Sequence, residues 1–252
     1  MWPFRDQAAV RREPQDHPQP ASGAAGRESR ASVNTVHPTD TRSQVFGPLV
    51  VRYDERVLTP RPWTLMQSNW AAALATQKTT GPMLELCAGA GQIGLAAAAL
   101  TGLALVQVEA DPVAAGYART NAAAAGRESQ VEVRNTRIQT ALKASERFSI
   151  ILADPPYLPT ADIARWPDDP VTAIDGGADG LDLTRVCLQV AADHLTRGGA
   201  LLLQVAGEPQ ARAVSAVLET TTTIDLIHQE TRHHDRDRAV MLLTKGTPQS
   251  NF

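Results

Sequence analysis

Glu85-Leu86-Cys87-Ala88-Gly89-Ala90-Gly91-Gln92-Ile93-Gly94 joins a short apolar segment, residues 83–87, to an alanine-rich segment, residues 92–100. The spacing Gly-x-Gly-x-x-Gly suits a strand that turns sharply into a helix, because glycine lets a ligand approach the backbone closely. A dinucleotide site has the same spacing. The loop by itself therefore predicts a nucleotide-type pocket and leaves its ligand open.

Short apolar segments and longer amphipathic segments alternate from this loop onward. This alternation predicts an α/β fold with a mostly parallel sheet and helices on both faces. Only a loop separates the last two strands, so we expect them to pair antiparallel at one edge of the sheet. Ligands of such sheets bind beyond the carboxyl ends of the strands. The expected strands are residues 83–87, 103–109, 131–134, 148–153, 200–205, 224–228 and 239–244, and the expected helices are 92–100, 112–125, 138–144, 181–195 and 209–218.

The chain has 252 residues, and its ends differ in composition from its middle. Residues 1–44 are rich in Pro, Ser, Arg and Gln and have no apolar periodicity, which predicts a disordered polar tail. The other expected parts are a lead-in at 45–80 (strands 46–51 and 52–58, helix 65–75), the α/β domain at 81–246 and a C-terminal tail at 247–252.

A second motif, Ala153-Asp154-Pro155-Pro156-Tyr157, follows the apolar residues 148–152. The Asp154 carboxylate and the Pro155 carbonyl can accept hydrogen bonds from both N–H groups of a planar –NH2. The two prolines fix φ and remove two backbone donors, so the turn is stiff and offers acceptors only. The Tyr157 ring can lie on the flat face of the group that is held. The motif predicts a clamp for an amide or an aromatic amine, and a proline-rich turn that merely ends a strand is the alternative.

Two acidic residues near the glycine loop narrow the choice of ligand. Glu85 lies within the strand before the loop, where an acid favours a ligand with an ammonium or sulfonium group and repels a pyrophosphate. Glu109 ends the next strand, where a carboxylate can bind both ribose hydroxyls. An adenosine ligand with a positively charged amino-acid arm fits both acids, which predicts S-adenosylmethionine as the cofactor. A salt-bridged Glu85 and a solvated Glu109 are the structural alternatives.

Together the two motifs predict transfer of a methyl group to nitrogen. Acceptors at Asp154 and Pro155 would orient the –NH2 and stabilise the positive charge that develops on it. Most of the gain in rate would come from positioning, with Asp154 acting as an orienting group more than as a base.

These motifs resemble those of the class I S-adenosylmethionine-dependent methyltransferases. Within that class the chain is similar to the HemK-like family, the protein-glutamine (release-factor) methyltransferases. The resemblance implies a Rossmann-like, mostly parallel seven-stranded sheet with an antiparallel edge strand. It is carried by residues 57–64, 84–94, 154–158, 173–181 and 197–203.

The resemblance also implies roles for individual residues. The substrate –NH2 would be gripped by the catalytic turn, and Arg61 would lie near the substrate in the lead-in. The implied catalytic residues are Asp154, Pro155, Pro156 and Tyr157, the last also binding substrate, and the implied cofactor-binding residues are Glu85, Cys87, Gly89, Gly91 and Glu109.

The chain departs from the family pattern at three places. Asp154 stands where the family usually has Asn, and Asp is also the form found in methyltransferases of adenine amines in DNA or RNA. Trp63 replaces the acid expected after Pro-Arg-Pro. Asn135-Thr136-Arg137 stand where an acid usually meets the adenine ring, and Asn135 is the candidate acceptor in its place.

Three functions therefore stay open. The first is methylation of a glutamine amide in a protein such as a translation factor. The second is N-methylation of an adenine or guanine amine in RNA or DNA, and the third is a non-catalytic adenosine-binding scaffold. A nicotinamide enzyme is a weaker reading because no catalytic proton donor can be identified.

Composition restricts partners and compartment. A net charge of −3 gives no support for a protein that coats nucleic acid. Cys87 and Cys187 lie in apolar surroundings and predict buried free thiols. No apolar run reaches the roughly 18 residues of a membrane span, and the start does not resemble a signal peptide, so a cytoplasmic location is expected. His233-His234-Asp235 lacks further ligand spacing, and no metal is expected.

Overall fold

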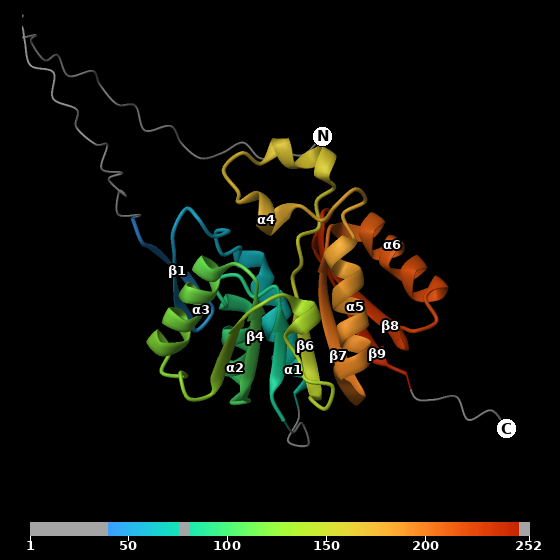
Figure 1. Ribbon diagram of the computed structural model, residues 1–252, viewed down its shortest axis with the longest axis horizontal. Helices are drawn as coiled ribbons and strands as arrows, with labels where there is room; N and C mark the ends of the chain where they lie inside the picture. Colours follow the sequence, from blue (N-terminus) through green and yellow to red (C-terminus); the bar gives the residue numbers. More distant parts are fainter. Residues whose placement is uncertain (1–39, 76–80, 247–252) are drawn as a thin grey trace, which may run out of the picture. The chain divides into compact units, whose positions relative to one another are not determined.

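The computed structural model describes residues 40–75 and 81–246 (Figure 1). The predicted N-terminal tail lies outside the described residues as far as residue 39, and so does the predicted tail at 247–252. Within the described part no helix is both long enough and apolar enough to cross a membrane.

Seven strands form one sheet in the order β5-β4-β3-β6-β7-β9-β8. Neighbouring strands from β5 to β7 run parallel, whereas β9 runs antiparallel to both β7 and β8. The mostly parallel α/β sheet and the antiparallel pair at one edge are thus confirmed. The strands are β3 (Met83–Leu86), β4 (Leu105–Glu109), β5 (Val131–Asn135), β6 (Phe148–Ala153), β7 (Leu195–Val205), β8 (Leu226–Asp235) and β9 (Arg238–Lys245).

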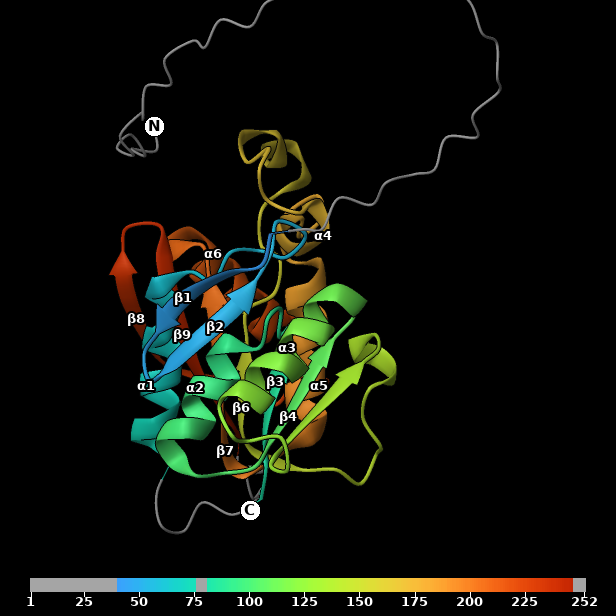
Figure 2. The same cartoon turned by 90° about the vertical axis from the view of Figure 1, so that its left-hand side faces the viewer.

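Helices cover both faces of the sheet (Figures 1 and 2). Side chains of a strand alternate between faces, so Leu84 and Leu86 pack in the cluster that contains α5, while Met83 packs in the cluster that contains α1 and α2. Full burial of one leucine contributes about 1.5–3 kcal/mol to folding. The helices are α1 (Leu65–Leu74), α2 (Gln92–Thr101) and α3 (Pro112–Ala124) on one face, and α5 (Asp182–His194) and α6 (Gly207–Thr220) on the other.

Two helices begin near the carboxyl ends of the strands, where ligands bind. Asp111 caps α3, since its Oδ1 accepts hydrogen bonds from the backbone N–H groups of Val113 (2.8 Å) and Ala114 (2.9 Å). Pro112 follows at the first helical position, which needs no donor. α2 begins after Gly91, whose φ of +82° lies in the left-handed region that favours glycine.

The lead-in is a hairpin whose strands lie earlier in the chain than predicted. β1 (Arg42–Phe46) and β2 (Leu49–Tyr53) pair antiparallel, so Gly47 and Pro48 form the turn. β1 therefore extends into the segment predicted as tail. The pattern gave no signal there because β1 is largely exposed and its polar residues need not alternate.

Short turns of helix and different strand bounds account for the other differences from the prediction, including β8, which ends at Asp235 and not at the expected residue 228. η2 (Ile138–Thr140) replaces the helix expected at 138–144, and β7 begins five residues before the expected start at Ala200. Three further elements carry too few residues for a periodic pattern to predict them. They are η1 (Pro62–Thr64), η3 (Thr160–Arg165) and α4 (Val171–Ile174).

Residues 158–180 form a cap beyond the carboxyl ends of the strands, with α4 in its return limb (Figures 1 and 2). The cap is closed by backbone hydrogen bonds from Leu158 N to Ile174 O (3.0 Å) and from Gly176 N to Leu158 O (2.8 Å). An isolated bridge also joins Leu158 to Asp175. The cap thus places the residues after the Asp154 turn over the edge of the sheet.

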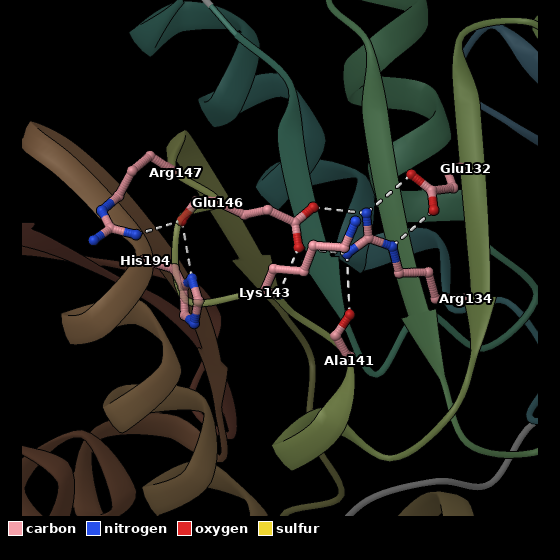
Figure 3. Close-up of polar contacts among 7 residues, drawn as sticks. All are labelled: Glu132, Arg134, Ala141, Lys143, Glu146, Arg147 and His194. Atoms are coloured by element: carbon pink, nitrogen blue, oxygen red, sulfur yellow. Dashed lines mark hydrogen bonds and ion pairs between the residues drawn. The ribbon is translucent and has the colours of Figure 1, made fainter.

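Arg134 lies in β5, the outermost strand on the side of the sheet away from β8, and it holds this strand through a polar network (Figure 3). Its guanidinium donates to Glu132 (2.9 Å), to Glu146 (2.7 Å) and to the Ala141 carbonyl (3.0 Å). The Glu146 carbonyl lies 3.0 Å from Nδ1 of His194 at the end of α5. Hydrogen bonding to Arg134 lowers the pKa of Glu146 to about 2.

Glu146→Gln is expected to destabilise the protein by about 1 kcal/mol at neutral pH, because the amide loses the charge that Arg134 binds. The folded-state pKa of Glu146 is lowered, so its contribution is present above the ordinary value of 4.5 and is lost as pH falls through about 2. Urea unfolding of wild type and variant across that range measures the difference. Glu128→Gln is the matched control, since Glu128 is an exposed acid outside this network. A difference that stays constant down to the lowest pH would contradict this assignment.

Candidate active site

One cavity of about 540 Å³ lies beyond the carboxyl ends of β3, β4 and β6. The glycine loop and the Asp154 turn, which are far apart in the sequence, both open into it. Arg61 of the lead-in and Thr172 of the cap complete its wall. Predicted site residues among those that line it are Arg61, Cys87, Gly89, Glu109, Asp154 and Pro156.

The glycine loop is held close to β4 and leaves little room for side chains. A Cβ atom on Gly91 would lie 2.7 Å from Nε2 of Gln107, so the loop backbone packs directly on that side chain. Gly91 itself does not line the cavity, whereas Gly89 does, and a Cβ on Gly89 would meet no atom within 4 Å. The loop therefore exposes its backbone to the cavity at Gly89, one of the predicted cofactor-binding residues.

Cys87 lies at the start of the loop and lines the cavity with its backbone in the left-handed region, at φ +58°. A left-handed conformation costs a non-glycine residue roughly 1–2 kcal/mol. Cys87 and the buried Cys187 are both free thiols. Contact with Cys187 and burial raise the pKa of Cys87, so the thiol stays protonated.

Glu85 lies behind the loop and does not line the cavity. Its Oε1 accepts from Gly94 N (2.9 Å) and its Oε2 accepts from Gln107 Nε2 (2.6 Å). Burial raises the pKa of Glu85 to about 7. The sequence predicted that Glu85 would face a cationic ligand, and the structure places its side chain behind the loop, outside the cavity lining. The carboxyl group instead joins β3 to α2 and β4 through these two hydrogen bonds.

Glu109 ends β4 and lines the cavity, as the sequence predicted. Its Oε2 accepts from Gly89 N (2.7 Å) and its Oε1 accepts from Asp111 N (2.8 Å). Burial raises its pKa above the ordinary range despite these hydrogen bonds. Two backbone N–H groups thus orient the carboxylate, and its remaining lone pairs can accept further hydrogen bonds from a ligand.

Asn135 does not line the cavity, although the sequence suggested it as an adenine contact. Its Nδ2 donates to the carbonyls of Glu109 (2.9 Å) and Ala110 (3.0 Å), so the side chain braces the ends of β4 and β5. Arg137, Ile138 and Gln139 line the cavity beyond β5 in its place. These residues reach the cavity because η2 follows directly after Arg137.

The Asp154 turn presents two of its four predicted residues to the cavity. Asp154 and Pro156 line it, whereas Pro155 is buried and the Tyr157 ring does not line it. Within the described residues no hydrogen bond holds the Asp154 carboxyl group, and burial raises its pKa to about 7. Burial also raises the pKa of Tyr157, which keeps the phenol neutral. Asp154 is therefore the acceptor that the turn offers to a ligand.

Arg61 lines the cavity and connects the lead-in to the cap. Its Nη2 donates to both carboxylate oxygens of Asp169, at 2.7 and 2.6 Å. The positive charge of Arg61 also lowers the pKa of Asp154, against the larger effect of burial. Sequence reasoning placed Arg61 near the substrate but found no partner for it, since Asp169 is 108 residues away.

Arg61→Ala is expected to raise the pKa of Asp154 further, because burial then acts without an opposing cation. A carbon-13 titration of the Asp154 carboxyl group should show its midpoint move to higher pH than in wild type. Asp169→Asn weakens the contact that holds Arg61 but keeps the positive charge of Arg61. It should therefore not raise the titration midpoint of Asp154. Arg165→Ala, an exposed arginine of the cap, is the control. A midpoint unchanged in Arg61→Ala would contradict the electrostatic role.

Trp63 occupies the position after Pro-Arg-Pro where an acid was expected. The guanidinium of Arg238 lies 3.8 Å from the centre of its ring and that of Arg61 lies 5.7 Å from it. Stacking on arginine thus fixes the segment that carries Arg61.

Within residues 40–75 and 81–246, no group of three or more His, Cys, Asp or Glu residues could hold a metal ion.

The parallel sheet, its antiparallel strand next to the edge and the cavity beyond the strand ends define the class I methyltransferase fold. The hMettl16 catalytic domain in complex with a MAT2A 3′UTR hairpin has this fold, with a TM-score of 0.65, 14% identity, and coverage of 81% of this chain and 77% of that chain. P. horikoshii TYW2 in complex with MeSAdo gives a TM-score of 0.58 at 12% identity, covering 81% of this chain and 70% of that chain.

The chain belongs to the family of the release factor glutamine methyltransferases. The relative of that name from Cereibacter sphaeroides is 32% identical over 203 residues, which cover 77% of this chain and 68% of the relative. The one from Deinococcus radiodurans is 34% identical over 169 residues, covering 64% of this chain and 58% of the relative. The family resemblance seen in the motifs is confirmed.

Two further comparisons bear on the extent of the likeness. A ribosomal protein uL3 glutamine methyltransferase from Bordetella pertussis is 30% identical over 162 residues, covering 62% of this chain and 54% of the relative. Residues 67–165 match the family described as "Conserved hypothetical protein 95". The chain spans 59% of the length of its Gloeobacter violaceus relative and 58% of the Deinococcus one.

Proposed function

We propose that this chain is an S-adenosylmethionine-dependent N-methyltransferase and that its acceptor is a glutamine side-chain amide in a protein. The observation that carries the proposal is that Gly89, Glu109 and Asp154 line the same cavity. Family membership supports a glutamine amide as the acceptor, since the relatives are named release factor glutamine methyltransferase and ribosomal protein uL3 glutamine methyltransferase. A translation factor or ribosomal protein is therefore the proposed partner.

The residues around the cavity fit S-adenosylmethionine. The volume of about 540 Å³ lies within the usual range for a small-molecule site. Glu109 would bind the ribose hydroxyls, the backbone at Gly89 would pass close to the ligand, and Ile138 with Gln139 would flank the adenine ring. When bound, the cofactor supplies an electrophilic methyl group.

The residues of the Asp154 turn would hold the acceptor amide. An amide nitrogen is a weak nucleophile because its lone pair is delocalised into the carbonyl group. A carboxylate acceptor at Asp154 would orient the –NH2 and stabilise the positive charge that develops on nitrogen during transfer. The methylated amide nitrogen is acidic and loses its proton afterwards, so no strong base is needed before transfer. Pro156 and the buried Pro155 keep the turn rigid, which favours positioning.

A second candidate acceptor is an exocyclic amine of adenine or guanine in RNA or DNA. The observation that favours it is the carboxylate of Asp154, since the family usually has an amide there. An aromatic amine presents the same planar –NH2 and could use the same acceptors. The net charge of −3 argues against this acceptor, because nucleic-acid affinity is largely electrostatic.

Transfer of labelled methyl groups into a bacterial lysate separates the two acceptors. The full-length protein is incubated with methyl-labelled S-adenosylmethionine and lysate, and the products are digested with protease or with nuclease. We expect label that protease releases, on a glutamine amide. Label released only by nuclease would replace the first candidate by the second. Cofactor binding without labelling of any fraction would indicate a non-catalytic adenosine-binding scaffold.

Glu109→Gln is expected to weaken the binding of S-adenosylhomocysteine by about tenfold to a hundredfold, the worth of one hydrogen bond to a charged group. The amide also weakens the two backbone contacts that orient residue 109. Calorimetric titration measures the change in Kd. Glu132→Gln on the exposed side of β5 is the matched control and should leave Kd unchanged. An unaltered Kd for Glu109→Gln would remove the ribose assignment.

A further inference from the structure

Gln67 is a polar residue on the buried side of α1, and its side chain is fully enclosed by the protein. The two N–H groups of its amide are both used. Nε2 donates to the Ala153 carbonyl (3.1 Å) and to the Leu202 carbonyl (2.8 Å). One rigid planar group thus joins the end of β6 to the neighbouring strand β7.

The position of these two carbonyls gives the contact its meaning. The Ala153 carbonyl and the Asp154 nitrogen belong to the same peptide unit. Gln67 therefore fixes the orientation of the peptide plane that precedes Asp154. Ala153 is also the last residue of β6 and pairs with Leu203, the residue after Leu202. The hydrogen bonds of Gln67 therefore restrain the base of the Asp154 turn from the side of the sheet opposite α5.

The surroundings of Gln67 indicate that its amide is not there to stabilise the core. Its Oε1 is buried and has no hydrogen-bond partner among the described residues. Gln204, two residues after Leu202 and therefore on the same face of β7, is also buried, and neither of its amide atoms has a partner in the described part of the chain. Unpaired buried polar atoms are unfavourable, and an apolar side chain would avoid this. Gln67 differs from Gln204 in its hydrogen bonds to the last residue of β6 and to β7.

We propose that Gln67 is a positioning residue for the methyl acceptor, acting through the Ala153–Asp154 peptide. This inference rests on the proposed function of the cavity. Gln67 touches neither the acceptor nor the cofactor. Its amide holds the Asp154 carboxylate at the angle from which it orients the –NH2, and loosening that angle lowers the rate without changing what binds.

The test compares two variants that make the same chemical change. Gln67→Met and Gln204→Met each replace a buried amide on one face of the sheet by an apolar chain of similar length. We expect Gln67→Met to lower kcat by about tenfold to a hundredfold, as a small misplacement of a reacting group does, with KM and the Kd for S-adenosylhomocysteine little changed. Gln204→Met should keep the wild-type kcat. Equal losses in both variants, or none in Gln67→Met, would overturn the proposal.

A second measurement does not depend on turnover. Carbon-13 titration of the Asp154 carboxyl group should show a midpoint shifted toward the ordinary range in Gln67→Met, because a looser turn admits water. Gln204→Met should titrate as wild type does. A wild-type protein that neither binds S-adenosylhomocysteine nor transfers a methyl group would refute the proposed function, while this titration would still decide whether Gln67 positions Asp154.

Discussion

Replacement of Asp154 by alanine is expected to lower methyl transfer by about a thousandfold, the upper range for losing one oriented group that stabilises developing charge. The carboxylate is the acceptor that the turn offers to the cavity, and no hydrogen bond within the described part of the chain shares it. Cofactor affinity should change by less than about tenfold, or 1.4 kcal/mol, because Glu109 and the glycine loop would bind the cofactor. Turnover of labelled cofactor and calorimetry measure the two quantities. Equal loss of both would mean that the turn is only structural.

Asp154→Asn is the matched variant, because it keeps one carbonyl acceptor and removes the charge. The wild-type pKa of Asp154 is raised to about 7, and the ionised form is the better acceptor. Wild-type activity should therefore rise with pH through about 7, whereas activity of Asp154→Asn should be flat across that range. A wild-type profile without this rising limb would contradict the role of the carboxylate.

The same raised pKa has a consequence for stability, with the opposite sign from that of Glu146. A buried acid whose folded-state pKa is raised stabilises the fold below its unfolded pKa of about 3.8, and this contribution is lost as pH rises through about 7. Relative to wild type, Asp154→Asn should thus gain stability as pH rises across that interval.

Gly94→Ala is expected to have the largest effect on the fold. A Cβ at residue 94 would lie 2.4 Å from Oε2 and 2.9 Å from Cδ of Glu85. Glu85 cannot move aside freely, because it accepts hydrogen bonds from Gly94 N and from Gln107. Overpacking of this kind costs about 1–3 kcal/mol, and the loss of a buried hydrogen bond adds to it. Chemical denaturation should show a lower midpoint together with weaker binding of S-adenosylhomocysteine.

Gly116→Ala provides the control for this substitution. Gly116 lies within α3, and a Cβ there would meet no atom within 4 Å. Alanine in a helix interior is favoured over glycine by about 0.5–1 kcal/mol, so the control should be slightly more stable than wild type. A Gly94→Ala protein as stable as Gly116→Ala would show that Glu85 does not fix the loop.

The sequence predicted the features that depend on repeating patterns. The β6 bounds were correct because residues 148–153 are apolar except for Ser149 and are followed by Pro155, which cannot continue a central strand. The antiparallel pair β8–β9 followed from the missing helix between the two strands. The sequence also predicted that the Asp154 turn and the glycine loop would line one cavity, because ligands bind where parallel strands end.

The contacts of individual polar side chains could not be predicted in the same way. Glu85 was expected to face a ligand, yet alternation along β3 places it on the side of α2, where Gly94 and Gln107 bind it. Asn135 was chosen by position, and η2 then carried Ile138 and Gln139 over the cavity instead. The pairing of Arg61 with Asp169 depends on how the cap folds back, which no local pattern encodes.

A crystal structure with S-adenosylhomocysteine tests most directly whether the two motifs form one site. The account predicts the ribose at Glu109 and the adenine beside Ile138 and Gln139. The sulfur should face the Asp154 carboxyl group, with space for one amide group between them. Density for the ligand outside this cavity, or a sulfur turned away from Asp154, would contradict it.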